Sequence, residues 1–266
     1  MDTFENRGRG PRAGGRVTSP DSGGDTHDQD TSGPSSVPPG KDRETSLPGP
    51  RPPAPGPVDR KAIGVFGGTF DPVHNGHLRI ALDAREALGL DEIRLIPLAQ
   101  AVHRDQPEAP AALRLEMLQA AIAGRPGLVA DDRELRRSGP SYSIDTLHSL
   151  RSDFPDSSMC LLLGDDAFSG FAAWRDPQGI LDIANIAVLQ RPGRQLPRAP
   201  ALEEIFRKHR ASRLDPARTG QILFCPVTQL DIASSDIRSR VANGRSVDYL
   251  LPAAVVDLIR QHGLYR

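Results

Sequence analysis

The segment from Ala62 to Leu78 reads AIGVFGGTFDPVHNGHL and carries most of the information about the fold. It begins with a short apolar run, Ala62–Phe66, which is typical of a buried β-strand. Two glycines and a polar stretch follow, and the residues from about His77 to Leu88 then have the spacing of a helix. A strand that leads through a glycine-containing turn into a helix indicates the first unit of an α/β fold.

Short apolar runs and helical stretches alternate through the rest of the chain. The run Met159–Leu163 is uninterrupted, as in a strand that is buried on both faces. We therefore predict an α/β fold with a doubly wound, mostly parallel sheet, helices on both faces and a small C-terminal helical part. The predicted strands are residues 62–66, 93–97, 128–130, 159–163, 186–189 and 222–224, and the predicted helices are residues 77–88, 111–123, a helix from Ser141 or Ser143 to about 150, 234–242 and 252–262.

The first 60 residues have a different composition from the rest. They hold 21 of the 50 glycines and prolines and few large apolar side chains. Such a segment cannot bury enough apolar surface to offset the conformational entropy that is lost on ordering. We predict that residues 1–60 are a disordered Pro/Gly-rich tail and that residues 61–266 form one domain.

Composition also excludes several classes of protein. The chain has 33 Lys+Arg against 34 Asp+Glu, so it offers no general basic surface for a nucleic acid. No apolar run is long enough to span a membrane, and the tail lacks the apolar core of a secretory signal, so we expect a cytoplasmic location. Cys160 and Cys225 each lie in an apolar run and are expected to be buried free thiols.

The residues that follow the first strand are suited to phosphate. Gly67 and Gly68 let a ligand approach the main chain closely, and Thr69 adds a hydroxyl group. His74 and His77 lie three residues apart where a helix begins, and the free N–H groups and dipole of a helix N-terminus favour anions. The segment therefore predicts a phosphate-binding site, with Gly76 leaving room for a nucleotide against the backbone.

Three other interpretations compete with this one. His74 and His77 could bind a metal ion, but no third ligand is evident and no Glu completes a His-Glu-x-x-His pattern, so we predict no metal site. The glycines could merely shape the turn, which would not explain the His, Thr and Asp beside them. Neither the dinucleotide fingerprint nor the Gly-Lys-Ser/Thr P-loop fits these residues, which indicates another kind of phosphate site.

The stretch from Gly67 to Leu78 resembles the signature of the nucleotidyltransferase superfamily that has a His-x-Gly-His motif. Within that superfamily it is most similar to the bacterial nicotinate-nucleotide adenylyltransferases, and the resemblance covers roughly residues 62–266. It implies a Rossmann-like fold of the nucleotidyltransferase type. Further matching segments are Glu134-Leu135, Pro140–Ser143, Thr146-Leu147, Gly164–Asp166, Trp174, Arg191–Gly193 and Gly263–Arg266.

The segment Ile232–Arg238, read as IASSDIR, resembles the second nucleotide motif of the family, Ile-Ser-Ser-Thr-x-Ile-Arg. It departs from that motif at Ala233 and Ser235. Ser234 or Ser235 could cap the helix that follows, and Arg238 could hold phosphate oxygens with two donors at once. An exposed helix charge is the alternative interpretation of Arg238.

The resemblance also implies residues for the acceptor of the transferred group. The flat ring of Trp174 suits stacking on a pyridine, although a core tryptophan is the alternative. Main-chain N–H groups near Ser143 and Arg175 would hold a carboxylate. His103 and Arg104 would face the phosphate or ribose of the acceptor.

Two further residues have roles that only the resemblance supplies. Arg191 would contact phosphate, with a solvated loop arginine as the alternative. Asp166 matches a family aspartate that faces a ribose, with a plain turn residue as the alternative.

The resemblance implies transfer of AMP from ATP, with Mg²⁺, to nicotinate mononucleotide, giving deamido-NAD and pyrophosphate. The acceptor phosphate would attack the α-phosphorus directly, with His77, His74 and Arg238 as the catalytic residues. Competing possibilities are another acceptor (phosphopantetheine or nicotinamide mononucleotide), a fragment of an aminoacyl-tRNA synthetase, and a nucleotide sensor without activity. The expected ATP-binding residues are Gly67, Gly68, Thr69, Phe70, His74, His77, Gly164, Asp166, Ile232, Ser234, Ser235 and Arg238, and the expected acceptor-binding residues are His103, Arg104, Ser143, Trp174, Arg175 and Arg191.

Overall fold

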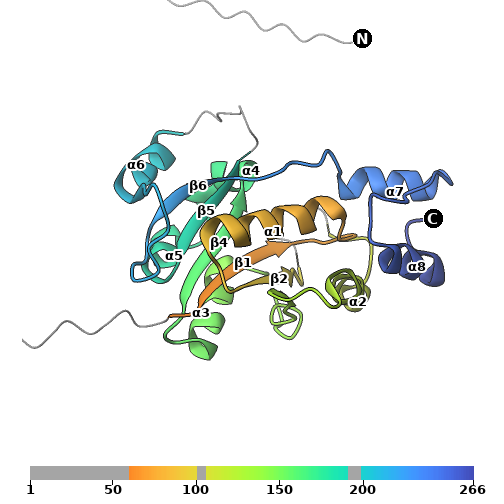
Figure 1. Cartoon of the computed structure of the whole chain (residues 1–266), viewed down its shortest axis with the longest axis horizontal. Helices are drawn as coiled ribbons and strands as arrows, with labels where there is room; N and C mark the ends of the chain where they lie inside the picture. The colour runs from red at the N-terminus through yellow and green to blue at the C-terminus, as the bar shows by residue number, and fades with distance from the viewer. Residues whose placement is uncertain (1–59, 101–105, 191–198) are drawn as a thin grey trace, which may run out of the picture. The chain divides into compact units, whose positions relative to one another are not determined.

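The computed structural model describes residues 60–100, 106–190 and 199–266. In these ranges six strands form one sheet in the order β3-β2-β1-β4-β5-β6, and every neighbouring pair is parallel. This is the strand order of a Rossmann fold, so the predicted fold class is confirmed (Figure 1). The strands are β1 (Ala62–Gly68), β2 (Glu92–Pro97), β3 (Leu128–Ala130), β4 (Ser158–Gly164), β5 (Asn185–Gln190) and β6 (Ile222–Pro226).

Helices connect the strands and follow the last of them. They are α1 (Asn75–Leu88), α2 (Ala111–Ile122), α3 (Ser143–Asp153), α4 (Asp165–Ser169), the 3₁₀ turn η1 (Phe171–Ala173), α5 (Pro177–Ile183), α6 (Pro200–His209), α7 (Ser234–Ala242) and α8 (Ala253–His262). Within the described ranges, no helix is both long enough and apolar enough to cross a membrane. The tail predicted for residues 1–60 lies outside these ranges except for Arg60, so that division of the chain stays a prediction.

Two helical regions were absent from the sequence prediction. The segment between β4 and β5 forms α4, η1 and α5, which are each too short to show a helical period. Asp176 caps α5 by accepting the N–H of Gly179 at 2.9 Å, and Pro177 occupies its first turn. The sequence prediction also missed α6, whose Leu202 and Phe206 form a buried stripe one turn apart.

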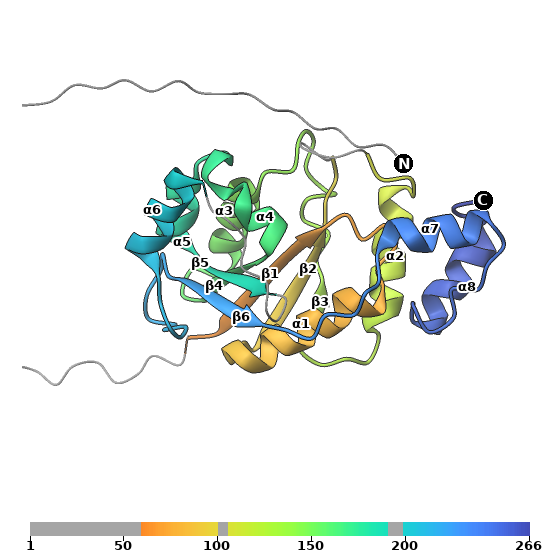
Figure 2. The same cartoon turned by 90° about the horizontal axis from the view of Figure 1, so that it is seen from above.

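Successive residues of the strands face opposite layers, as the pleat of a sheet requires. Cys160 and Leu162 of β4 pack with residues of α1, α2, α7 and α8, whereas Met159, Leu161 and Leu163 pack with residues of α3, α5 and α6. Figure 2 shows helices on the two sides of the sheet, with α7 and α8 beside α2. Cys160 and Cys225 are buried free thiols, as predicted.

The sheet has its topological switch point between β1 and β4. The chain moves outward from β1 to β2 and β3, then returns to the other side of β1 for β4, β5 and β6. The helices on the two sides diverge here, which opens a crevice at the carboxyl ends of the two central strands. Both Gly68 and Gly164 end strands at this place.

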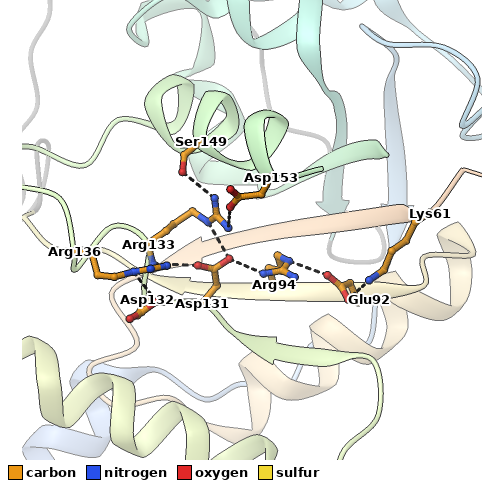
Figure 3. A network of polar contacts seen from close by, with 9 residues as sticks. All are labelled: Lys61, Glu92, Arg94, Asp131, Asp132, Arg133, Arg136, Ser149 and Asp153. Carbon is orange, nitrogen blue, oxygen red and sulfur yellow. Dashed lines mark hydrogen bonds and ion pairs between the residues drawn. The ribbon is translucent and has the colours of Figure 1, made fainter. Parts of the chain in front are cut away.

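A network of charged side chains runs across β1, β2 and β3 on the side of α3 (Figure 3). Lys61 and Arg94 both pair with Glu92, at 2.6 and 2.8 Å. Arg94 then reaches Asp131 at 3.0 Å, and Asp131 accepts Arg133 at 2.9 Å. The network fixes the chain just after β3, an edge strand of three residues.

Asp131 is the centre of this network. Its burial alone would raise the pKa of the carboxyl group, but hydrogen bonds from Arg94 and Arg133 outweigh that effect and lower the pKa. Arg133 also donates to Ser149 and pairs with Asp153 on α3, at 2.9 and 3.2 Å. The carboxylate of Asp131 is therefore ionised and joins the sheet edge to α3.

We expect Asp131→Ala to lower the free energy of unfolding by about 3 kcal/mol, because it leaves buried guanidinium groups without their shared carboxylate. The neighbouring Asp132 supplies a matched control, since it forms an exposed pair with Arg136 one helical turn away. Asp132→Ala should change the unfolding free energy by less than about 0.5 kcal/mol. Urea denaturation of both variants measures the difference, and equal effects would contradict the assignment.

Candidate active site

His74 and His77 cap the first turn of α1 reciprocally. His74 is the N-cap residue, and its Nδ1 accepts the backbone N–H of His77 at 3.3 Å. In return, Nδ1 of His77 accepts the backbone N–H of His74 at 3.4 Å. The rings stack with their centroids 3.7 Å apart. The helix therefore begins at Asn75, two residues before the predicted start.

This arrangement fixes the protonation state of both imidazoles. Burial lowers the pKa of His74 to about 4. Burial, followed by the charge on His74, lowers the pKa of His77 well below its ordinary value. Both rings are thus neutral near pH 7, and because each Nδ1 is an acceptor, each proton lies on Nε2. The motif therefore supplies neutral N–H donors at the start of a helix.

Gly76 has a different role from the predicted one. It is buried, and a Cβ atom at this position would lie 2.9 Å from Nδ1 of His74. The glycine is required because the imidazole of the N-cap residue occupies this space. Gly67, by contrast, faces open space, since a Cβ atom there would meet nothing within 4 Å.

The turn between β1 and α1 has a strained backbone and a buried aromatic ring. Phe70 has a φ of 47°, which is rare for a residue with a large side chain. Its ring is fully buried and meets the ring of His77 edge to face at 5.1 Å. Backbone conformations of this kind persist where the surroundings hold them in place, and they are concentrated at functional sites.

Arg114 of α2 holds this turn, and the sequence analysis missed it. Its guanidinium is buried and donates to three carbonyl oxygens: Thr69 at 2.7 Å, Leu98 at 2.8 Å and Ala109 at 3.2 Å. It therefore joins the ends of β1 and β2 to the start of α2. A single arginine within an apolar helical stretch was the only sequence signal for this role.

The second motif lies against the same turn. Ser234 begins α7, and its hydroxyl donates to the carbonyl of Pro72 at 3.0 Å. Arg238 donates to the carbonyl of Asp71 at 3.0 Å and to Oε1 of Glu108 at 2.5 Å. The predicted serine cap was wrong, because Ala233 is the N-cap residue and no side chain caps α7. The first N–H groups of α7 are left available to an anion.

A cavity of about 430 Å³ lies at the switch point. Its walls come from the end of β1, the end of β4 and the start of α4, the start of α3, and Trp174. The predicted site residues that line it are Gly67, Gly68, Thr69, Phe70, His77, Ser143, Gly164, Asp166 and Trp174.

The cavity is also lined by Ser143 and Trp174, two of the residues predicted for the acceptor. Ser143 begins α3, whose N-terminus has no side-chain cap, so its first N–H groups are suited to a carboxylate. This corrects the predicted cap, since Tyr142 is the N-cap residue. Trp174 meets Phe171 edge to face at 5.7 Å and also lines the cavity, so its predicted stacking on an acceptor ring stays a prediction.

Comparison with known proteins agrees with this geometry. The family model described as Cytidylyltransferase-like matches residues 65–240. A probable nicotinate-nucleotide adenylyltransferase of Hydrogenovibrio crunogenus is 47% identical over 206 residues, which are 77% of this chain and 98% of that protein. One of the same name from Methylococcus capsulatus is 46% identical over 209 residues, covering 76% and 99%.

The chain belongs to the nicotinate-nucleotide adenylyltransferase family. A solved structure also shares its fold: Plasmodium falciparum nicotinic acid mononucleotide adenylyltransferase complexed with NaAD has a TM-score of 0.59 at 17% identity, covering 77% of this chain and 98% of that one. The resemblance predicted from the sequence is confirmed, and the chain is an enzyme of the nucleotidyltransferase class.

Three further predicted site residues, Ile232, Ser235 and Arg175, are not among those that line the cavity. Ile232 lies beside Gly76, and Ser235 is exposed in the first turn of α7. Arg175 is exposed, lies over the ring of Tyr142 at 4.8 Å and pairs with Asp145 at 3.6 Å. His103, Arg104 and Arg191 lie outside the described residues.

Glu134 lines the cavity although the prediction assigned it no role. The side chain is buried, and Oε1 accepts the hydroxyl of Thr146 on α3 at 2.6 Å. Arg133, in the charged network of Figure 3, precedes it directly. In the described ranges, no three His, Cys, Asp or Glu side chains lie close enough together to hold a metal ion.

The low pKa of His74 predicts a specific pH dependence of stability. Between pH 6.5 and about 4 the unfolded chain binds a proton that the folded protein does not bind, so the unfolding free energy decreases as the pH falls through this range. His74→Asn retains a side-chain acceptor at the N-cap but cannot titrate. We expect the wild type to lose about 2 kcal/mol more than the variant between pH 7 and pH 4, measured by urea denaturation. Parallel pH profiles would contradict a neutral, buried His74.

Proposed function

We propose that this enzyme transfers AMP from MgATP to nicotinate mononucleotide, forming deamido-NAD and pyrophosphate as a step of NAD biosynthesis. The observation that carries the proposal is the single cavity that joins the His-x-Gly-His turn to the open N-terminus of α3 and Trp174. The names of the relatives support the same reaction. The proposal includes the cytoplasmic location predicted from the sequence.

In the proposed mechanism the acceptor phosphate attacks the α-phosphorus in line, and no covalent enzyme intermediate forms. Catalysis of such a transfer depends on positioning and on stabilising charge at the phosphate oxygens. Nε2–H of His77 would donate to the α-phosphate and His74 to the phosphates beside it. Arg238 and Ser234, beside the uncapped start of α7, would hold the leaving pyrophosphate.

The neutral state of the histidines suits this task. A hydrogen bond from a neutral imidazole to an anionic oxygen strengthens as charge develops on that oxygen. Positive charge would come from Arg238, whose guanidinium pairs with Glu108 at 2.5 Å. Magnesium enters as part of the substrate, bound to the phosphate oxygens of ATP.

The acceptor end favours an acid over an amide. The open N–H groups of a helix N-terminus stabilise a carboxylate through hydrogen bonds and the helix dipole. An amide in the same place gains no comparable charge interaction and brings N–H donors that would face other donors. This difference predicts nicotinate mononucleotide as the preferred acceptor.

The test is purified enzyme with ATP and Mg²⁺ and each of three acceptors in parallel. We expect pyrophosphate release and dinucleotide formation with nicotinate mononucleotide, a lower kcat/KM with nicotinamide mononucleotide, and no product with phosphopantetheine. Faster reaction with either of the other two acceptors would replace the proposed substrate. ATP binding without product from any acceptor would indicate a nucleotide sensor.

We expect His77→Ala to fold normally and to lower kcat by about 10²–10³-fold, because it removes a donor to the reacting phosphate. His148, which is exposed on α3, provides the matched control, and His148→Ala should keep the wild-type kcat. Steady-state pyrophosphate release and circular dichroism give the two readouts. Near-normal turnover by His77→Ala would remove this residue from the mechanism.

A further inference from the structure

The C-terminal segment Gly263–Arg266 matches the family, yet nothing in the proposed mechanism uses it. It follows α8, which ends at Gly263 with φ at 60°, and the N–H of Leu264 returns to the carbonyl of Ile259 at 3.0 Å. This turn reverses the chain and directs the next residue inward. Tyr265 is consequently buried, although it is the last residue but one.

The hydroxyl of Tyr265 donates to Oδ1 of Asp71 at 2.7 Å. Asp71 is a buried carboxylate in the turn between β1 and α1, three residues before His74. The backbone N–H groups of Glu108 and Ala109 also donate to it, at 2.7 and 3.1 Å. Asp71 is not among the described residues that line the cavity, so its contacts hold the turn itself.

We propose that Tyr265 is a positioning residue for the nucleotide: through Asp71 it holds the phosphate-binding turn, and with it His74 and His77, in the geometry that receives ATP. This inference rests on the proposed function, because it assigns ATP to that turn. It extends the nucleotide site to the end of the chain, beyond the part matched by the family model, residues 65–240.

The contacts of the turn show why one hydroxyl group matters. Arg114 holds the carbonyl of Thr69, Arg238 that of Asp71 and Ser234 that of Pro72. These three donors act on the backbone, and Arg238 also lies 4.0 Å from the Asp71 carboxylate, but among the described side chains Tyr265 is the one that donates a hydrogen bond to that carboxylate. Without the hydroxyl, a buried anion would lose one of its donors and the turn would be free to shift.

The backbone and ionisation state of Tyr265 fit a fixed donor. Its φ of 62° is unfavourable for a residue with a side chain, so packing and the bond to Asp71 must hold it in place. Burial, together with the hydrogen bond to Asp71 and the charge of that residue, raises the pKa of Tyr265 far above its ordinary value. The phenol is therefore protonated near pH 7 and acts as a donor.

The deciding experiment compares Tyr265→Phe with Tyr249→Phe in the full-length protein. Tyr249 is the matched control, because its side chain is almost fully exposed. Calorimetric titration with the non-hydrolysable analogue α,β-methylene-ATP and, separately, with nicotinate mononucleotide measures the two sites. We expect Tyr265→Phe to bind the analogue about tenfold more weakly, with unchanged affinity for nicotinate mononucleotide, and Tyr249→Phe to match the wild type.

Two results would overturn the proposal: wild-type affinity for the analogue in Tyr265→Phe, or an equal loss for both ligands, which a general loss of structure would produce. Absence of analogue binding by the wild type would instead contradict the proposed function. If Tyr265→Phe does not fold, Asp71→Asn reports on the same bond. Where both fold, the double variant should lose no more affinity than the more affected single variant, because both remove one interaction.

Discussion

The hydrogen bonds to the buried carboxylate of Asp71 are the interaction on which the site depends. A buried carboxyl group is costly unless it has hydrogen-bond donors, and here the donors come from the segment before α2 and from Tyr265, with Arg238 of α7 4.0 Å away. Meeting this requirement brings residues 108–109 and Tyr265 to one turn of the chain. The turn between these segments places His77 at the cavity. The hydrogen bonds that Asp71 requires therefore also fix the position of the His-x-Gly-His motif.

The charge distribution of the site follows from the same surroundings. Burial keeps His74 and His77 neutral, so in the proposed mechanism the motif would bind phosphate through N–H donors and the start of a helix rather than through full charge. Arg238 carries the formal charge, and Glu108 balances it. A net charge of -1 over the whole chain is compatible with the anionic substrate proposed above, because the proposal needs only local donors and one arginine.

The acceptor end is held by a separate set of contacts. The network of Figure 3 joins the edge of the sheet to α3 through Asp131 and Arg133. Glu134 follows directly, and its contact with Thr146 fixes the first turn of α3 beside the cavity. The start of α3 and the turn between β1 and α1 are thus held by different sets of contacts.

The sequence by itself determined the six strands, the doubly wound class and the phosphate motif, because these depend on local periodicity and on short spacings. It did not show α4–α5 or α6, because these helices are short and offer at most two or three turns of periodicity. It identified His77 but assigned Gly76 to the ligand, since only the folded turn shows that the ring of His74 fills that space. The roles of Arg114 and of Tyr265 at Asp71 were decided by tertiary structure alone. Their partners lie 45 and 194 residues away, and no local pattern encodes a contact between segments so far apart in the chain.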